Sequence, residues 1–347
     1  MKRILVIGAG VNGLSSAVKI AENFYNQAQV TVISDEISPN TTGDGSAGLW
    51  GPFLLSDTPD EKIVQWSKET HDFFKELWIH GLSKEAGVTL IPCLRLTTEP
   101  NFKEPCWKNV VFGYSALTEQ ELNRIRLEHE RNYSGGAQFV TFTAEPIKLL
   151  PYLYKRFEQA GGRFIRRKVF KLDELTKENY DLIINCTGLG SKYLVNDSNV
   201  KPIRGQVARV SAPWQFQAIL DDSDDGNYVI PNQNSCIVGG THQTDDFNVM
   251  PCPKDREFIF VGCAKMVKSI KNAPVLREWV GLRPGRTTVR IEFEDYETEN
   301  GEKIAVIQNY GHGGAGVTLC WGCATDVVKL ASQKLELKFA KQEQSKL

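Results

Sequence analysis

The chain has 347 residues, about the length of two ordinary domains, and carries 41 Lys and Arg against 42 Asp and Glu. A formal net charge of -1 offers no electrostatic footprint for nucleic acid, and 41% hydrophobic with 24% charged residues exclude a disordered, collagen-like or coiled-coil chain. No apolar run approaches the roughly 20 residues of a membrane-spanning helix, so we expect neither nucleic acid nor a membrane as partner.

The first 35 residues predict a βαβ unit, with strands over 4–7 and 30–34 and a helix over 14–24. The first strand runs into a G-x-G-x-x-G motif made of Gly8, Ala9, Gly10, Val11, Asn12 and Gly13. In this context the three glycines allow a tight turn, approach of the backbone to a pyrophosphate and packing of helix on strand. Asp35 follows at the spacing of about 20 residues expected of an acid that binds a ribose hydroxyl. The motif therefore predicts a dinucleotide site at the helix N-terminus.

Later elements predict an α/β fold with an added antiparallel sheet. A Gly-, Thr- and Ser-rich loop over 38–53 is long enough to indicate a functional role. Helices are expected over 60–82, 118–126, 147–160 and 323–337, and strands over 88–97, 164–169, 182–186, 207–210, 228–230, 235–238, 289–293 and 303–308. From this order we expect a discontinuous cofactor domain over 1–50, 145–200 and 305–340, a substrate or cap domain over 51–144 and 201–304, and a tail over 341–347.

The cofactor is predicted to be FAD rather than a nicotinamide. A nicotinamide enzyme ordinarily continues with regular βα units, whereas here the 38–53 loop intervenes. Glycine-rich strand ends also return at 185–188 and 309–316, which suits an extended FAD. A nicotinamide dehydrogenase and a non-enzymatic flavoprotein stay as alternatives.

The eight cysteines favour buried structural thiols. Cys320 and Cys323 have the spacing of a zinc or redox pair, but no second pair of ligands accompanies them, so no metal site is expected. The final tripeptide Ser345-Lys346-Leu347 is typical of a peroxisomal address. We therefore expect a peroxisomal import receptor as partner and the peroxisomal matrix as location.

Seven segments in order resemble the D-amino-acid oxidase and D-aspartate oxidase family. They are IGAGVNGLSSA (7–17), TTGDGSAGLWGP (41–52), NCTGLGS (185–191), IRGQV (203–207), NYVIP (227–231), VGLRP (280–284) and NYGHGGAGVT (309–318). The resemblance implies a Rossmann-type FAD-binding domain interleaved with a largely antiparallel substrate domain. It also implies oxidative deamination of D-amino acids to 2-oxo acids, ammonia and hydrogen peroxide. A homodimer is kept as a further hypothesis.

The resemblance also implies roles for individual residues. Arg283 would bind the substrate α-carboxylate, Tyr228 would add a hydroxyl contact, and the carbonyl of Gly314 would accept from the amine. Flavin contacts would come, besides the first glycine motif and Asp35, from Thr41, Thr42, Ala47, Gly48, Leu49, Val169, Thr187, Gly188, Gly313, Gly314, Gly316, Val317 and Thr318. No side chain would serve as general base, because hydride would pass directly to the flavin. His312, set between glycines, is expected to be structural or flavin-adjacent.

The choice of substrate side chain rests on short local motifs. Several of them favour the D-aspartate branch, and a protonated His242 could pair with a distal carboxylate. Leu220 and His242 nevertheless stand where that branch is expected to place arginines, and Gly51 and Phe53 replace larger polar groups. We therefore favour D-aspartate oxidase activity and keep oxidation of neutral D-amino acids as the alternative.

Overall fold

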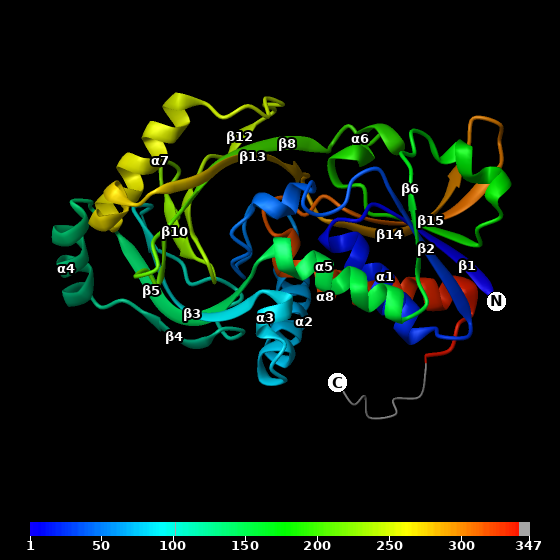
Figure 1. Ribbon diagram of the computed structural model, residues 1–347, viewed down its shortest axis with the longest axis horizontal. Helices are drawn as coiled ribbons and strands as arrows, with labels where there is room; N and C mark the ends of the chain where they lie inside the picture. Colours follow the sequence, from blue (N-terminus) through cyan, green and yellow to red (C-terminus); the bar gives the residue numbers. More distant parts are fainter. Residues whose placement is uncertain (101, 340–347) are drawn as a thin grey trace.

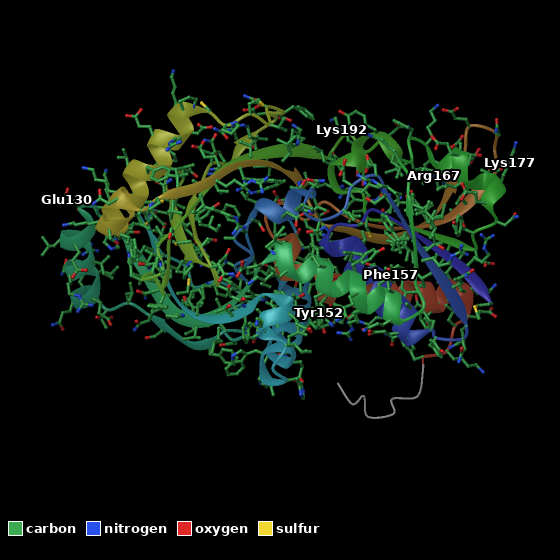
Figure 2. The ribbon with its side chains drawn as sticks, viewed as in Figure 1. Glu130, Tyr152, Phe157, Arg167, Lys177 and Lys192 are labelled. Carbon is green, nitrogen blue, oxygen red and sulfur yellow. The ribbon has the colours of Figure 1, made fainter. Side chains whose placement is uncertain are left out.

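The structure, a computed structural model, describes residues 1–100 and 102–339. Its strands form two sheets that lie beside one another along the long axis of the molecule (Figure 1). Glu130 and Lys177 lie at opposite ends of this axis (Figure 2). In the described part of the chain, no helix combines the length and the apolar character that crossing a bilayer demands.

The six-stranded sheet has a parallel core. Its strands, in spatial order, are β14 (Arg290–Glu297), β15 (Lys303–Tyr310), β7 (Leu182–Asn185), β1 (Lys2–Ile7), β2 (Ala28–Ser34) and β6 (Arg163–Arg166). Every neighbouring pair is parallel except β14 with β15. Residues 4–7 of β1 are buried, as expected of a central strand covered on both faces. The carboxyl ends of β1, β2, β7 and β15 consequently share one edge.

Helix α1 (Val11–Asn23) packs beside this sheet between α5 (Pro146–Gln159) and α8 (Gly316–Leu335), and α8 packs in turn on α2 (Asp60–Ile79). Helix α1 buries Leu14, Ala17, Val18 and Ala21, which recur at helical spacing. The predicted start of the last helix at Cys323 was wrong. Helix α8 begins at Gly316. Its glycines weaken the helical pattern in the sequence, but a Cβ at Gly322 would overlap the backbone of Trp66 in α2, so the close packing of these helices requires glycine there.

The nine-stranded sheet is largely antiparallel. Its path runs through β12 (Gln243–Thr244), β8 (Lys201–Val210), β11 (Cys236–Gly239), β10 (Tyr228–Pro231), β9 (Ala218–Asp221), β3 (Val88–Thr97), β5 (Gly135–Ala144) and β4 (Phe112–Ala116), and β13 (Val275–Gly285) also pairs with β8. Its outer face packs on α7 (Pro253–Met266). Helix α7 also contacts α4 (Glu119–His129) at the left end of the molecule in Figure 1. The short helices α3 (Ser83–Ala86) and α6 (Ser191–Leu194) complete the fold.

The predicted division into domains stays a prediction. Strand β14 falls in the range expected for the second domain, yet it pairs with β15 in the six-stranded sheet. The α/β class with an added antiparallel sheet is confirmed by the two sheets and their helices.

Candidate active site

Four of the predicted cofactor segments follow strands of the six-stranded sheet at one edge. Gly8 follows β1, Asp35 follows β2, Thr187 lies just beyond β7 and Gly311 follows β15. Because these strands are parallel, the sheet brings together segments that are far apart in sequence. A cofactor at this edge would lie where open α/β sheets ordinarily bind ligands.

The three glycines of the first motif differ in what surrounds them. Gly8 has φ +106°, and a Cβ at Gly13 would overlap the carbonyl oxygen of Gly8, so helix α1 packs directly on the turn. Gly10, by contrast, has an ordinary extended conformation, and a Cβ at this position would meet no atom of residues 1–100 or 102–339 within 4 Å. The open space at Gly10 beside the N-terminus of α1 is where a pyrophosphate can approach the backbone.

The predicted contacts from Thr41 to Leu49 lie on a loop that joins the two sheets. Leu49 pairs with Thr143 of β5, and the Gly48 carbonyl accepts from the Ala144 amide at 2.8 Å. Gly48 has φ +69° and no room for a Cβ against the Ala144 carbonyl. Asp44 caps the turn by accepting from the backbone of Thr41 at 2.9 Å. Val317 and Thr318 lie in the first turn of α8.

Two residues that sequence reasoning missed hold this loop. Arg209 donates through Nη2 to the carbonyl of Ser46 at 3.2 Å, and Asn232 donates to the carbonyl of Ala47 at 2.9 Å. Arg209 also donates to Asn232 Oδ1 at 3.1 Å. No motif marks these residues, because their role depends on the approach of β8 and β10 to a distant loop.

The other predicted cofactor contacts occupy the same edge. Asp35 is exposed, with its carboxylate 3.5 Å from Lys168 Nζ. Val169 packs partly buried against the cluster around Leu172. Thr187 donates through Oγ1 to Asn185 Oδ1 at 2.7 Å, and Gly188 has φ +55°.

The donor and acceptor set at this edge fits FAD. Buried Asn12 Oδ1, Asn309 Oδ1 and His312 Nε2 have no hydrogen-bond partner among the residues that the structure describes. Buried polar atoms ordinarily have partners, and an extended dinucleotide provides many. Together with the space at Gly10, these atoms are consistent with FAD held by the segments at 8–13, 35, 187–188 and 313–318.

The two predicted carboxylate-binding residues lie on one face of the nine-stranded sheet. Arg283 of β13 is half-buried, with its guanidinium over Gly205 and its Nη1 donating to the Thr241 carbonyl at 2.9 Å. No carboxylate of residues 1–100 or 102–339 lies within 4 Å of its charged nitrogens, which leaves donors for a ligand. The Tyr228 phenol lies over Gly239 and Gly240. Burial raises the pKa of Tyr228, while the Arg283 charge opposes that rise.

The glycines beneath these side chains are positions that sequence reasoning missed. A Cβ at Gly205 would overlap the Arg283 guanidinium, and a Cβ at Gly239 or Gly240 would meet the Tyr228 ring or hydroxyl within about 2.5 Å. Only the register of β8, β10, β11 and β13 shows that these residues share a site.

Gly314 lies close to the Arg283 strand. The Gly313 amide donates to the Pro284 carbonyl at 2.9 Å, and Gly188 also packs near Pro284. Gly314 is exposed on an otherwise buried loop and lies against the half-exposed ring of Phe53. The structure therefore brings the predicted amine-binding carbonyl, the carboxylate-binding strand and a cofactor segment together.

Leu220 and His242, the two residues expected to distinguish acidic from neutral substrate side chains, lie at different parts of the nine-stranded sheet. Leu220 of β9 lies directly opposite Tyr228 of β10, so the two side chains share a face. His242 is half-buried just before β12, next to Thr241, and no side-chain partner of His242 is found in the described part of the chain.

His312 is a poor candidate for a general base. It is 1% exposed, its Nδ1 lies 3.2 Å from Asn12 Nδ2, and burial lowers its pKa to about 3. A base with so low a pKa is almost fully deprotonated at neutral pH but accepts a proton weakly. This geometry supports the expected structural or cofactor-adjacent role.

The low pKa of His312 predicts a stability change with pH. The unfolded chain binds a proton below about pH 6.5 whereas the folded chain does so only near pH 3, so falling pH favours unfolding across this interval. Both proteins should lose stability when the pH is lowered from about 6.5 to about 4.5. The loss of unfolding free energy is expected to be about 2 kcal/mol smaller in His312→Asn than in the wild type, because the variant lacks this buried imidazole. Urea unfolding of the two proteins at both pH values measures this difference. Equal losses of unfolding free energy in the two proteins would contradict this prediction.

The cysteine pair behaves as buried structural thiols. Cys320 and Cys323 are buried in α8, and burial raises the pKa of Cys320 to about 11. Among the residues described, no cluster of three or more His, Cys, Asp or Glu could hold a metal ion.

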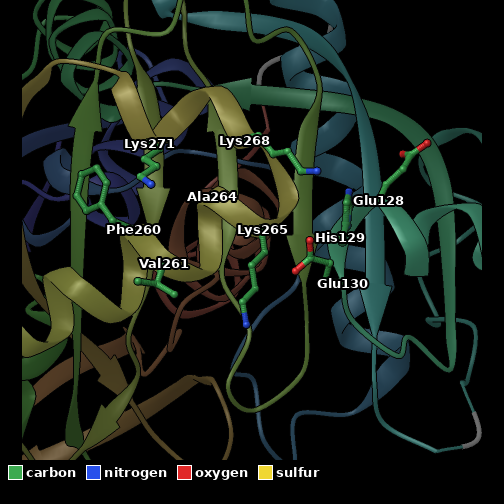
Figure 3. A pocket seen from close by; sticks show the side chains of 9 residues that line it. All are labelled: Glu128, His129, Glu130, Phe260, Val261, Ala264, Lys265, Lys268 and Lys271. Carbon is green, nitrogen blue, oxygen red and sulfur yellow. The ribbon is translucent and has the colours of Figure 1, made fainter.

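A cavity of about 440 Å³ lies far from this edge, between the end of α4 and helix α7 (Figure 3). Its lining includes His129, Phe260, Lys265 and Lys268, none of which belongs to the predicted site. The cavity therefore does not mark the candidate active site.

Comparisons with known proteins agree with this arrangement. Residues 3–330 match the DAO family, described as "FAD dependent oxidoreductase". The chain is 36% identical to a D-amino acid oxidase of Dugesia ryukyuensis over 96% of this chain and 98% of the relative. It is also 36% identical to D-aspartate oxidase of Homo sapiens over 95% of each. Glycine oxidase from Geobacillus kaustophilus shares the fold, with a TM-score of 0.76 at 18% identity over 98% of this chain and 97% of that one. The chain therefore belongs to the FAD-dependent oxidoreductase family that contains the D-amino-acid and D-aspartate oxidases.

Proposed function

We propose that this protein catalyses oxidative deamination of D-amino acids, with dioxygen as acceptor and a 2-oxo acid, ammonia and hydrogen peroxide as products. The observation that carries the proposal is the placement of Arg283 and Tyr228 on one sheet face beside the exposed Gly314. FAD, when bound, supplies the two-electron acceptor.

The residues of this chain would orient the substrate. The Arg283 guanidinium can donate two parallel hydrogen bonds to a carboxylate, and the Tyr228 hydroxyl can add another. The Gly314 carbonyl would accept from a neutral amine. With two substituents of Cα fixed, only one enantiomer directs its Cα hydrogen toward the cofactor edge, so the arrangement discriminates D from L without a side-chain base.

The substrate branch is proposed to be acidic, with His242 as partner of a distal carboxylate when protonated. Neutral D-amino acids are the second candidate, because Leu220 faces the same side as Tyr228 and Phe53 lies against Gly314. Oxygen uptake with D-aspartate, D-glutamate, D-alanine and D-proline distinguishes them. Higher kcat/KM for D-aspartate supports the acidic branch, and higher kcat/KM for D-alanine or D-proline supports the neutral branch.

Tyr228→Phe is expected to raise KM about 10- to 100-fold with a smaller change in kcat. One hydrogen bond to a charged carboxylate contributes about 1.5–3 kcal/mol, and the contact is made both before and during the reaction. Steady-state oxygen uptake at varied substrate concentration measures the separate changes in KM and kcat. An unchanged KM would show that the hydroxyl does not contact the carboxylate.

We also propose import into the peroxisomal matrix through Ser345–Leu347, which lies outside the described residues. Hydrogen peroxide as a product agrees with that compartment. Fluorescent fusions with and without the last three residues test the import proposal: both versions in the cytosol would contradict it. Light scattering of the purified protein would test the homodimer hypothesis.

A further inference from the structure

A buried carboxylate lies behind the candidate active site, on the loop between α6 and β8. Asp197 is 8% exposed and accepts two hydrogen bonds on Oδ2, from Arg286 Nε at 2.9 Å and from the Tyr310 hydroxyl at 2.8 Å. Its Oδ1 accepts from the Asn199 amide at 3.0 Å. Both carboxylate oxygens are therefore engaged, and Asp197 joins two segments that the sequence separates.

The first segment is the end of β13. Arg286 lies three residues beyond Arg283, and its Nη1 donates to the Thr288 carbonyl at 3.1 Å. The Arg286 stem packs so closely on Gly311, which has φ +84°, that a Cβ there would meet the Arg286 Cβ at 2.9 Å. The Asp197–Arg286 pair thus presses the turn after Arg283 against the loop that contains Gly314.

The second segment is the end of β15. Tyr310 is fully buried and precedes the Gly311–Gly316 loop, and its hydroxyl also accepts from Arg290 Nη1 at 2.7 Å. Arg290 donates in turn through Nη2 to Glu294 at 2.5 Å. The Tyr310 ring is consequently fixed from both sides at the start of the loop.

The hydrogen bonds continue toward the predicted flavin contact at Thr187. Gln308 donates to Glu294 Oε1 at 2.6 Å, and Asn185 donates to Gln308 Oε1 at 2.8 Å. Asn185 Oδ1 accepts from Thr187 Oγ1 at 2.7 Å. One connected set of side chains therefore reaches the segments predicted to bind the carboxylate, the amine and the cofactor.

We propose that Asp197 is a positioning residue that sets the separation between the Arg283 guanidinium and the Gly314 carbonyl without touching the substrate. This inference rests on the proposed function, in which those two groups hold the carboxylate and the amine. Asp197 anchors both segments through one oxygen, so its loss removes the one carboxylate that joins them to each other. A displacement of about 1 Å at such a site can lower a rate by roughly a hundredfold.

Asp197→Asn disrupts this anchor with little change of volume. Arg286, Tyr310 and the Asn199 amide all donate to the carboxylate, so an amide nitrogen faces a donor in either orientation. In the FAD-loaded enzyme we expect kcat/KM for the best D-amino acid to fall at least 30-fold, mainly through kcat. Bound flavin should remain stoichiometric. Affinity for propionate, which has a carboxylate but no amine, should change less than threefold, because it requires only the carboxylate-binding residues.

Three variants complete the experiment. Tyr310→Phe removes one of the hydrogen-bond donors to Asp197 and should lower kcat/KM about 5- to 10-fold. If Asp197→Asn does not fold, this variant tests the positioning role, and wild-type kcat/KM in Tyr310→Phe would then contradict it. Asp197→Glu keeps the charge and should recover part of the activity. Asp181→Asn removes a carboxylate that pairs with Lys2 at the amino ends of β1 and β7, the edge of the six-stranded sheet opposite the candidate site, and it should match the wild type.

Two results would overturn the inference. One is wild-type kcat/KM in folded Asp197→Asn. The other is an equal loss of turnover, propionate affinity and flavin content, which would assign Asp197 a general structural role. A wild-type enzyme that oxidises no D-amino acid would instead contradict the proposed function, and this inference with it; activity in the wild type and in Asp197→Asn alike would contradict the inference alone.

Discussion

Arg283→Ala is expected to keep bound FAD and to lower kcat/KM for D-amino acids about a thousandfold. The guanidinium lies on the substrate-side strand β13, away from the first glycine motif, so its removal leaves the predicted cofactor contacts in place. Two charge-assisted hydrogen bonds of about 1.5–3 kcal/mol each would be lost, and about 4 kcal/mol corresponds to that factor. Flavin absorbance of the purified variant and steady-state oxygen uptake provide the two measurements.

Two further variants sharpen this prediction. Arg283→Lys keeps the charge but loses the planar pair of donors, so an intermediate loss is expected. Arg277→Ala changes an exposed arginine of the same strand and should retain activity. Unchanged KM and kcat in Arg283→Ala would show that Arg283 does not bind the substrate carboxylate.

Gly10→Ala and Gly13→Ala are expected to fail in different ways. A methyl group at Gly10 meets no atom in the described part of the chain, so the apoprotein should fold with unfolding free energy within about 1 kcal/mol of the wild type. FAD affinity, by contrast, should fall at least a hundredfold. A methyl group at Gly13 overlaps the Gly8 carbonyl, so overpacking should destabilise the apoprotein by about 1–3 kcal/mol or more.

Urea unfolding of the apoproteins and titration with FAD separate these effects. Gly301→Ala serves as control for FAD affinity, because Gly301 also has open space around a Cβ but lies in the turn between β14 and β15, outside the predicted cofactor contacts. Normal FAD affinity in Gly10→Ala would contradict the placement of the pyrophosphate at this turn.

The sequence was sufficient where structure and function depend on neighbouring residues. The βαβ unit of the first 35 residues follows from local apolar periodicity and from a motif whose glycines act within one turn. Strand β3 was likewise predicted with its observed bounds, because apolar and polar residues alternate at both ends of the segment, over 88–90 and 94–97.

Features that depend on distant contacts were not predictable. Strand β13 carries charged and half-buried residues, so no apolar pattern marks it, and β8 was recognised only from Val207 because its first half is basic. The roles of Gly205 and Gly239 emerge only when β8, β11 and β13 are aligned. Arg209 and Asp197 likewise acquire their partners only after distant loops come together.

Anaerobic addition of single amino acids to the purified protein, followed by its visible absorption spectrum, tests the central claim most directly. The protein should contain bound oxidised FAD, and at least one of D-aspartate, D-glutamate, D-alanine and D-proline should bleach its absorbance while the corresponding L-enantiomer leaves it unchanged. An FAD-loaded protein that none of these D-amino acids reduces, or that both enantiomers reduce equally, would contradict the proposed reaction.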